Sequence, residues 1–104
     1  MTKIRTSNGC IVVTPEVNVV ASSAETVRKE LLALINQDTN ELVVDLSKVR
    51  RVDSMGIGVF IATYNALKKK EKKLVVVNAS PKIKSLFQTM GLLRRFSVSG
   101  ATPD

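Results

Sequence analysis

The sequence predicts an α/β domain, with a mixed, mostly parallel sheet of about four to five strands covered by about three to four helices. Two short apolar runs, residues 42–44 and 74–77, are continuously hydrophobic, as strands buried on both faces are. Helical patterns precede, separate and follow these runs, so strands and helices alternate. Near the start, Asn8-Gly9 is typical of a tight turn, and it predicts a hairpin that pairs residues 3–6 with residues 10–14.

A first helix is expected to begin at Ser22 or Ser23 and to end near Ile35. The stretch 22–25 offers a capping box, in which a serine and a glutamate satisfy the free amides of a helix start. Apolar residues recur on one face of this helix at Ala24, Val27, Leu31, Leu34 and Ile35.

Two further helices are predicted, one from about Gly56 to Lys70 and one from Ser80-Pro81 to Gly91. The second begins with a serine cap followed by a proline, and Gly91 ends it. The apolar stripe of the first contains Val59, Phe60, Thr63 and Leu67, and the inward residues of the second are Ile83, Leu86, Phe87 and Met90. Residues 96–98 are a candidate for a last edge strand.

The length of 104 residues suits one domain over residues 1–104 with one modest core. We expect residues 3–98 to be ordered and the small, polar tail 99–104 to be frayed. No apolar stretch approaches the roughly 20 residues that cross a bilayer, and the first residues lack the apolar segment of a signal peptide. The cytoplasm is the expected location.

The inventory of reactive side chains argues against an enzyme. There is no histidine, and Cys10 is the single cysteine, which excludes Cys–His catalysis, zinc sites and an internal disulfide. Cys10 lies in an apolar run and is expected to be a buried structural thiol. Asp45 and Asp53 follow strands and could hold a magnesium ion, although Asp45 more simply anchors a turn. We expect no metal and no cofactor.

The net charge of +7 owes much to the lysine cluster at residues 68–73. Lysines at the end of a helix complement its dipole, so a solvated, stabilising face is the simplest interpretation. Nucleic acid or anionic lipid is the alternative ligand, but interleaved aromatic residues and a reading helix are missing. If the cluster lies near a docking face, its partner should be acidic.

The segment 49–60 is the main candidate site, because it combines the end of a strand, a polar turn and the start of a helix. Either Asp53 or Ser54 can cap this helix. A phosphate on Ser54 would lie against free amides and the positive end of the helix dipole. Ser54 is therefore either a phosphorylated switch or a plain helix cap, and Gly56 and Gly58 either admit a partner or are merely tolerated.

The segments 43–49, 52–59, 74–78 and 82–92 resemble a STAS domain. Within that family the chain is similar to bacterial anti-sigma factor antagonists of the sporulation and general-stress type. The likeness runs from about Lys3 to Val98 and centres on the Asp-Ser-x-Gly-x-Gly turn.

The resemblance implies partner switching in the regulation of transcription. The unphosphorylated antagonist binds an anti-sigma factor that is also an ATP-dependent serine kinase, and the sigma factor is released. The kinase phosphorylates Ser54, which weakens the complex, and a serine phosphatase restores it. The partner-binding residues carried over are Asn18, Asp53, Ser54, Met55, Gly56, Ile57 and Gly58. A monomer is expected for the free protein, with no direct binding of nucleic acid or membrane.

Two residues depart from the family pattern. Many relatives have an aspartate where this chain has the neutral Asn18, and a serine or threonine where it has Met55. These departures leave room for an alternative function, a phosphorylation-independent STAS accessory or scaffold subunit of a transport or signalling assembly.

Overall fold

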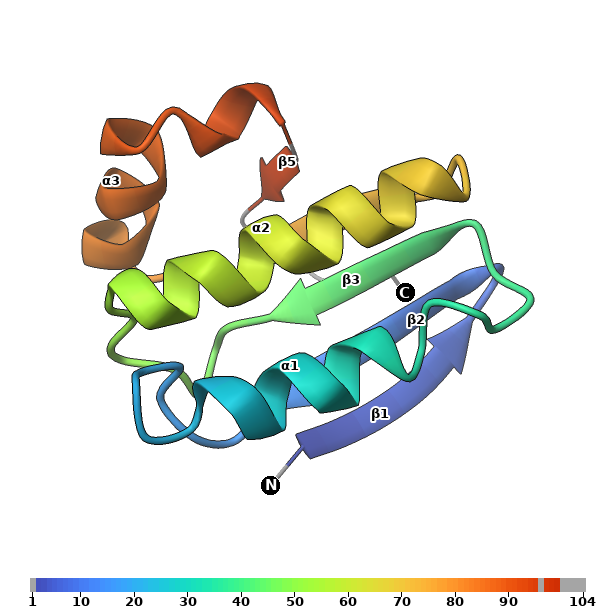
Figure 1. Cartoon of the computed structure of the whole chain (residues 1–104), viewed down its shortest axis with the longest axis horizontal. Coiled ribbons are helices and arrows are strands. Elements are labelled where there is room, and N and C mark those ends of the chain that lie inside the picture. The colour runs from blue at the N-terminus through green and yellow to red at the C-terminus, as the bar shows by residue number, and fades with distance from the viewer. Residues whose placement is uncertain (1, 96, 100–104) are drawn as a thin grey trace.

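Five strands form one mixed sheet in the order β1-β2-β3-β4-β5 (Figure 1). The computed structural model describes residues 2–95 and 97–99. The elements along the chain are β1 (Thr2–Ser7), β2 (Cys10–Pro15), α1 (Ala24–Leu32), β3 (Glu41–Asp45), α2 (Ser54–Lys69), β4 (Lys73–Val77), α3 (Pro81–Thr89), the 3₁₀ helix η1 (Leu92–Arg94) and β5 (Ser97–Ser99). The predicted α/β class and the predicted succession of elements are confirmed.

The sheet combines one antiparallel pair with parallel pairs. β1 and β2 form the predicted hairpin, and both turn residues have positive φ, 44° at Asn8 and 83° at Gly9. β2, β3, β4 and β5 pair in parallel. The carboxyl ends of β2, β3 and β4 therefore lie at the same edge of the sheet, beside the start of α2 (Figure 1).

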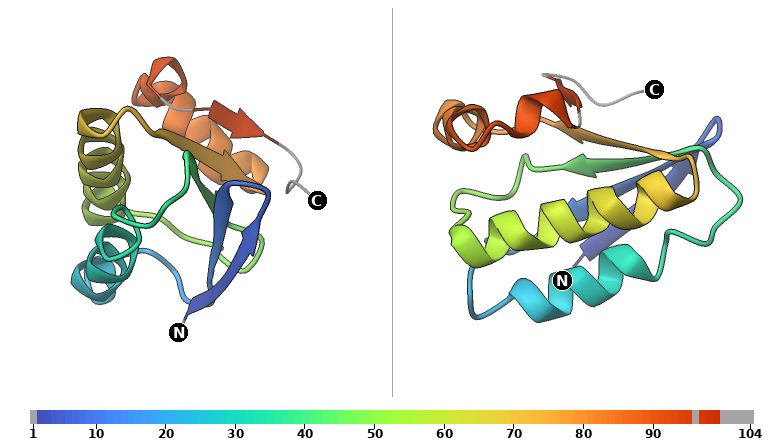
Figure 2. Two further views of the ribbon diagram at one scale, coloured as in Figure 1. Left: turned by 90° about the vertical axis from the view of Figure 1, so that its right-hand side faces the viewer. Right: turned by 45° about the horizontal axis from the view of Figure 1, so that its top comes forward.

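The main core lies between the sheet and the helices. α1 and α2 run side by side across one face of the sheet, as both views in Figure 2 show. Val13, Val44 and Val76 stand in register on three neighbouring strands beneath them and are fully buried. The rings of Phe60 in α2 and Phe87 in α3 meet edge to face, with centroids 5.3 Å apart.

The predicted apolar stripe of α2 is confirmed, because Val59, Phe60, Thr63 and Leu67 are all buried. Thr63 tolerates this environment because its hydroxyl donates to the Val59 carbonyl oxygen at 2.8 Å. On α1, Ala24, Val27 and Leu31 are buried. The helix ends at Leu32, before the predicted end near Ile35, and in the turn that follows Leu34 is half-buried and Ile35 is buried.

Two details of the helix predictions are wrong. Met90 was expected to point inward, but it is 52% exposed because α3 ends at Thr89 and Met90 is its C-cap. The capping box of α1 does not form. Ser23 is the N-cap, yet its hydroxyl accepts from the Val20 amide within the preceding loop, and Glu25 pairs with Arg28.

Cys10 is half-buried, not buried as predicted. Its Sγ lies 3.5 Å from Oε1 of Glu41, and burial together with this carboxylate raises the pKa of the thiol. The thiol thus stays protonated and unreactive at neutral pH. The predicted edge strand is present as β5, which includes Ser99 from the expected tail, whereas Phe96 and residues 100–104 lie outside the described residues.

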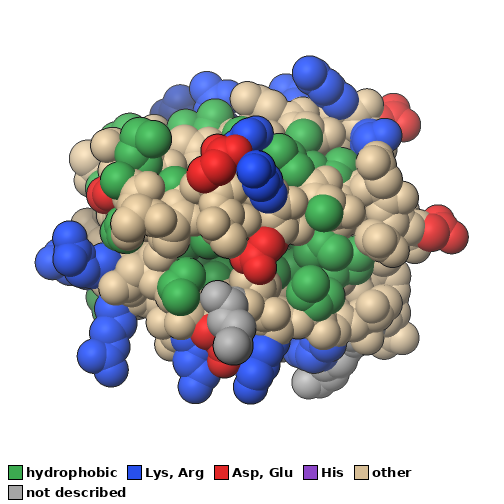
Figure 3. Space-filling view, turned by 60° about the horizontal axis from the view of Figure 1, so that its bottom comes forward, with side chains coloured by type: hydrophobic (Ala, Val, Ile, Leu, Met, Phe, Trp, Pro, Cys, Tyr) green, Lys and Arg blue, Asp and Glu red, His purple; other side chains and the backbone are tan. Residues whose placement is uncertain are grey.

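Among the described residues, a few hydrophobic side chains are exposed at the surface. The large ones are Ile4, Val17, Met55, Met90 and Leu93. On the face drawn in Figure 3, Lys and Arg side chains project mainly around the rim. Among the described residues, no helix has the length and apolar character that crossing a bilayer requires.

Candidate functional site

The loop after β2 and the segment before α2 are joined at the carboxyl edge of the sheet. Val19 and Val52 form an isolated parallel bridge. The Val19 amide donates to the Arg51 carbonyl oxygen at 3.1 Å, and the Asp53 amide donates to the Val19 carbonyl oxygen at 3.4 Å. This short ladder sets the position from which α2 begins.

Asp53 connects these two segments through its side chain. It is the N-cap of α2, where its Oδ1 accepts from the Gly56 amide at 3.0 Å. Its Oδ2 accepts from the Ala21 amide, 2.9 Å away in the other loop. The hydrogen bond from Gly56, and then that from Ala21, holds the pKa of the Asp53 carboxyl below its usual range. Asp53 is therefore an ionised clamp between the loop and the helix.

Asn18 is a second tie between the same segments. Its Oδ1 accepts from the backbone amides of Arg50 at 2.8 Å and Arg51 at 3.1 Å. Both bonds need only an acceptor oxygen, which an asparagine supplies as well as an aspartate does. Asn18 thus ties the two segments together without adding a second negative charge to that of Asp53.

Ser54 is the first residue of α2 and its side chain is exposed. Because Asp53 caps the helix, the interpretation of Ser54 as a plain helix cap is wrong. Among the described residues, the Ser54 hydroxyl has no hydrogen-bond partner. A free hydroxyl thus stands at the amino end of a long helix, where a phosphate is electrostatically favoured.

The remaining residues of the predicted site divide into buried and exposed ones. Ile57 is 3% exposed and belongs to the core. Gly56 is buried, and a Cβ there would lie 2.0 Å from the Val19 carbonyl oxygen. Because both residues are buried, neither lies on a surface that a partner can contact, contrary to their assignment as contact residues. Met55 is 57% exposed, and a Cβ on Gly58 would meet open space, so these two positions are accessible.

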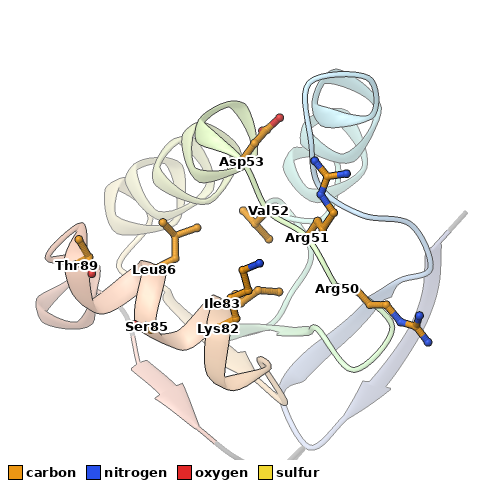
Figure 4. Close-up of a pocket in the computed structure, with 9 residues that line it drawn as sticks. All are labelled: Arg50, Arg51, Val52, Asp53, Lys82, Ile83, Ser85, Leu86 and Thr89. Carbon is orange, nitrogen blue, oxygen red and sulfur yellow. The ribbon is translucent and has the colours of Figure 1, made fainter.

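A cationic hollow of about 420 Å³ lies between the start of α2 and α3. Arg50, Arg51 and Lys82 line it together with Asp53, Val52, Ile83, Ser85, Leu86 and Thr89 (Figure 4). We call this space the near pocket. The cations come from two segments that are far apart in the chain. No site role was predicted for these cations, although the pair of arginines directly before Val52-Asp53 is a visible signal in the sequence.

The lysine cluster at residues 68–73 lies at the opposite end of α2 from Ser54. At about 1.5 Å per residue, the helix separates Ser54 from Lys68 by roughly 20 Å. Lys72 has a local role, because its Nζ donates to the carbonyl oxygens of Ile35 and Gln37, both at 2.6 Å. The lysine cluster is therefore too far from Ser54 to guide an acidic partner toward it.

Asp45 anchors a turn, as the simpler interpretation predicted. Its Oδ1 accepts from the Ser47 amide at 2.9 Å and from Nδ2 of Asn78 at 3.0 Å. In the described part of the chain, neither Asp45 nor Asp53 belongs to a group of three or more acidic, cysteine or histidine side chains that could hold a metal ion.

Comparison with known proteins agrees with this geometry. A family model described as the STAS domain matches residues 1–102. The anti-sigma-B factor antagonist of Staphylococcus aureus is 35% identical over 75 residues, which are 71% of this chain and 69% of that protein. An anti-sigma factor antagonist from Mycobacterium paratuberculosis, of known structure, is 25% identical with a TM-score of 0.86, covering 97% of this chain and 86% of its own.

The phosphorylated form of the Bacillus cell fate determinant SpoIIAA has the same fold. Its structure is 18% identical to this chain in sequence, with a TM-score of 0.73, and the match covers 98% of this chain and 92% of that one.

Gly56→Ala and Gly58→Ala should change the free energy of unfolding in opposite directions. At Gly56 the new methyl group collides with Val19, so we expect a loss of about 1–3 kcal/mol. At Gly58 it meets open space, and removing a glycine from a helix interior should add about 0.5–1 kcal/mol. Urea unfolding of both variants measures the two values. Equal effects would contradict the close approach of the loop to α2.

Asp53→Asn should reduce the dependence of stability on acid pH. The folded pKa of Asp53 is lowered, so its contribution is present above the unfolded value near 4 and is lost as the pH falls through the folded value. Unfolding free energies measured from neutral to acid pH should therefore fall more steeply for the wild type than for the variant. Parallel curves would show that Asp53 is not the clamp inferred from its two hydrogen bonds.

Proposed function

The chain belongs to the STAS domain family, and on that premise we propose that it is an anti-sigma factor antagonist, a non-enzymatic regulator switched by phosphorylation of Ser54. Its unphosphorylated form binds an anti-sigma factor that is an ATP-dependent serine kinase, and the sigma factor is released. Phosphorylation of Ser54 by that kinase ends the complex, and a serine phosphatase restores it. This exchange takes place in the cytoplasm, and the free protein is a monomer.

One observation carries the phosphorylation step. The Ser54 hydroxyl is exposed on the first turn of α2, and among the described residues it has no hydrogen-bond partner, because Asp53 performs the capping. A kinase can therefore reach the hydroxyl without opening the fold. The phosphate would adjoin the amino end of α2, so the folded state can keep it without unfolding.

The switch acts through local charge. A phosphate brings about −1.5 to −2 charges to a hydroxyl-sized position next to the ionised Asp53 carboxylate. A partner surface that accepts the single negative charge of Asp53 then faces nearly three negative charges, and it must also accommodate the larger phosphate group. The complex is lost through repulsion and steric exclusion at the interface, while the core beneath it remains packed.

The proposed contact surface consists of Ser54, the exposed Met55 and Gly58, with Val17 on the adjoining loop. Met55 offers an unbranched, adaptable apolar contact in place of the hydroxyl residue of relatives. Gly58 lets the partner's backbone approach α2 closely. The cations of the near pocket flank this surface, so the partner should present carboxylates there.

Ser54→Asp should weaken binding to the cognate anti-sigma factor by about tenfold or more while leaving the fold intact. Ser54→Ala is the matched control, since it removes the hydroxyl without adding charge and leaves the Asp53 cap in place. It should bind like the wild type and resist phosphorylation. Titration calorimetry measures the affinities, and circular dichroism checks the folds.

Unchanged affinity of Ser54→Asp, together with unmodified Ser54 in cells under every growth condition, would contradict the switch. That outcome would favour the alternative of a phosphorylation-independent scaffold subunit.

Lys82→Glu should slow association with the anti-sigma factor by about threefold to tenfold at low salt, because it reverses a charge in the near pocket. Lys84→Glu makes the same change in net charge at an exposed position of α3 outside the pocket, and it should have little effect. Stopped-flow association rates at two salt concentrations separate the two variants. Equal slowing would mean that overall charge, not the near pocket, guides the encounter.

A further inference from the structure

A second cationic hollow lies at the opposite end of α2 from Ser54. It has a volume of about 360 Å³, and we call it the distal groove. Its lining residues are Tyr64, Lys68, Lys72, Lys73, Leu74, Leu93, Arg94 and Arg95. Five of the eight are cations and none is acidic. They come from the end of α2, the start of β4 and the segment around η1.

Local ion pairing does not explain this gathering of like charges. The ion pairs within the described residues are Lys3–Glu16 and Arg28–Glu25, so no cation of the distal groove faces a described carboxylate at ion-pair distance. Lys72 is occupied by the carbonyl oxygens of Ile35 and Gln37. The other four leave a positive potential that is unbalanced within the described chain and that attracts an anionic ligand.

We propose that the distal groove binds an acidic polypeptide segment of a partner protein. Carboxylates of such a segment would pair with Lys68, Lys73, Arg94 and Arg95, and an apolar side chain would lie on Leu93, which is 39% exposed. A concave site with an apolar wall suits an extended chain that carries both kinds of side chain.

Single-stranded nucleic acid and an anionic lipid bilayer fit the groove less well than an acidic polypeptide does. Single-stranded nucleic acid gains affinity by stacking its bases on aromatic faces. Tyr64 is the aromatic residue of the groove, and the Nζ of Lys68 already lies over its ring, 5.8 Å from the centroid. A bilayer is flat on this scale and cannot follow a hollow, so its headgroups would reach only the outermost cations.

The distal groove is independent of the proposed switch. Roughly 20 Å of helix separates it from Ser54, well beyond the Debye length of about 8 Å at physiological salt. A partner in the distal groove should therefore remain bound whether or not Ser54 is phosphorylated. The groove thus adds a docking function to this chain and does not depend on the identity of the anti-sigma factor.

The test uses the full chain and a short fluorescent peptide rich in glutamate with a single leucine. Lys68→Glu combined with Arg94→Glu should weaken its binding, measured by fluorescence anisotropy, by about tenfold or more. The matched control combines Lys48→Glu with Lys84→Glu, which changes the net charge equally at exposed positions outside the groove. It should weaken binding by less than about twofold. Ser54→Asp should bind the peptide like the wild type.

Equal losses in the two double variants would overturn the proposal, because binding would then follow net charge alone. Tighter binding of a single-stranded oligonucleotide or of anionic phosphatidylglycerol vesicles than of the peptide, at the same salt, would also overturn it in favour of those ligands. Thermal unfolding verifies the fold of each variant. If the double variant does not fold, Arg94→Ala at its exposed position replaces it, with a loss of about threefold expected.

Discussion

The whole candidate site depends on one carboxylate that serves two segments. Asp53 closes the first turn of α2 with one oxygen and holds the loop after β2 with the other. The close approach of Val19 to Gly56 is possible because the helix has no side chain at that point. Asn18 strengthens the same junction through two backbone amides. The edge of the sheet that carries the site is therefore a rigid assembly of backbone and short polar side chains.

Ser54 is available as a switch because Asp53, and not Ser54, caps α2. If the serine hydroxyl were the helix cap, the phosphate oxygens would have to take over its hydrogen bond, so each phosphorylation would alter the start of the helix. Because Asp53 performs that role, the charge of Ser54 can change without loss of a structural contact. The proposed regulation can thus act at the surface and spare the core, as a reversible switch between partners requires.

Helix α2 also separates two regions of positive charge that the net charge of +7 does not distinguish. The near pocket adjoins Ser54 and suits the steering of an acidic partner toward the switch. The distal groove lies at the other end of the helix, beyond the range of that switch. Within the lysine cluster, Lys72 has a structural role, and Lys68, Lys72 and Lys73 line the distal groove.

The sequence by itself determined the order of the elements, the hairpin at Asn8-Gly9 and the place of Ser54 at a helix start. Turns, caps and hydrophobic periodicity depend on residues that are close along the chain, and a single sequence shows them. Only the tertiary structure decided that Asp53 reaches Ala21, 32 positions away, and that Gly56 lies against Val19. Likewise, the cations of both hollows are assembled from distant segments. Such contacts arise when the parallel strands bring separate loops to one edge, and no local pattern encodes them.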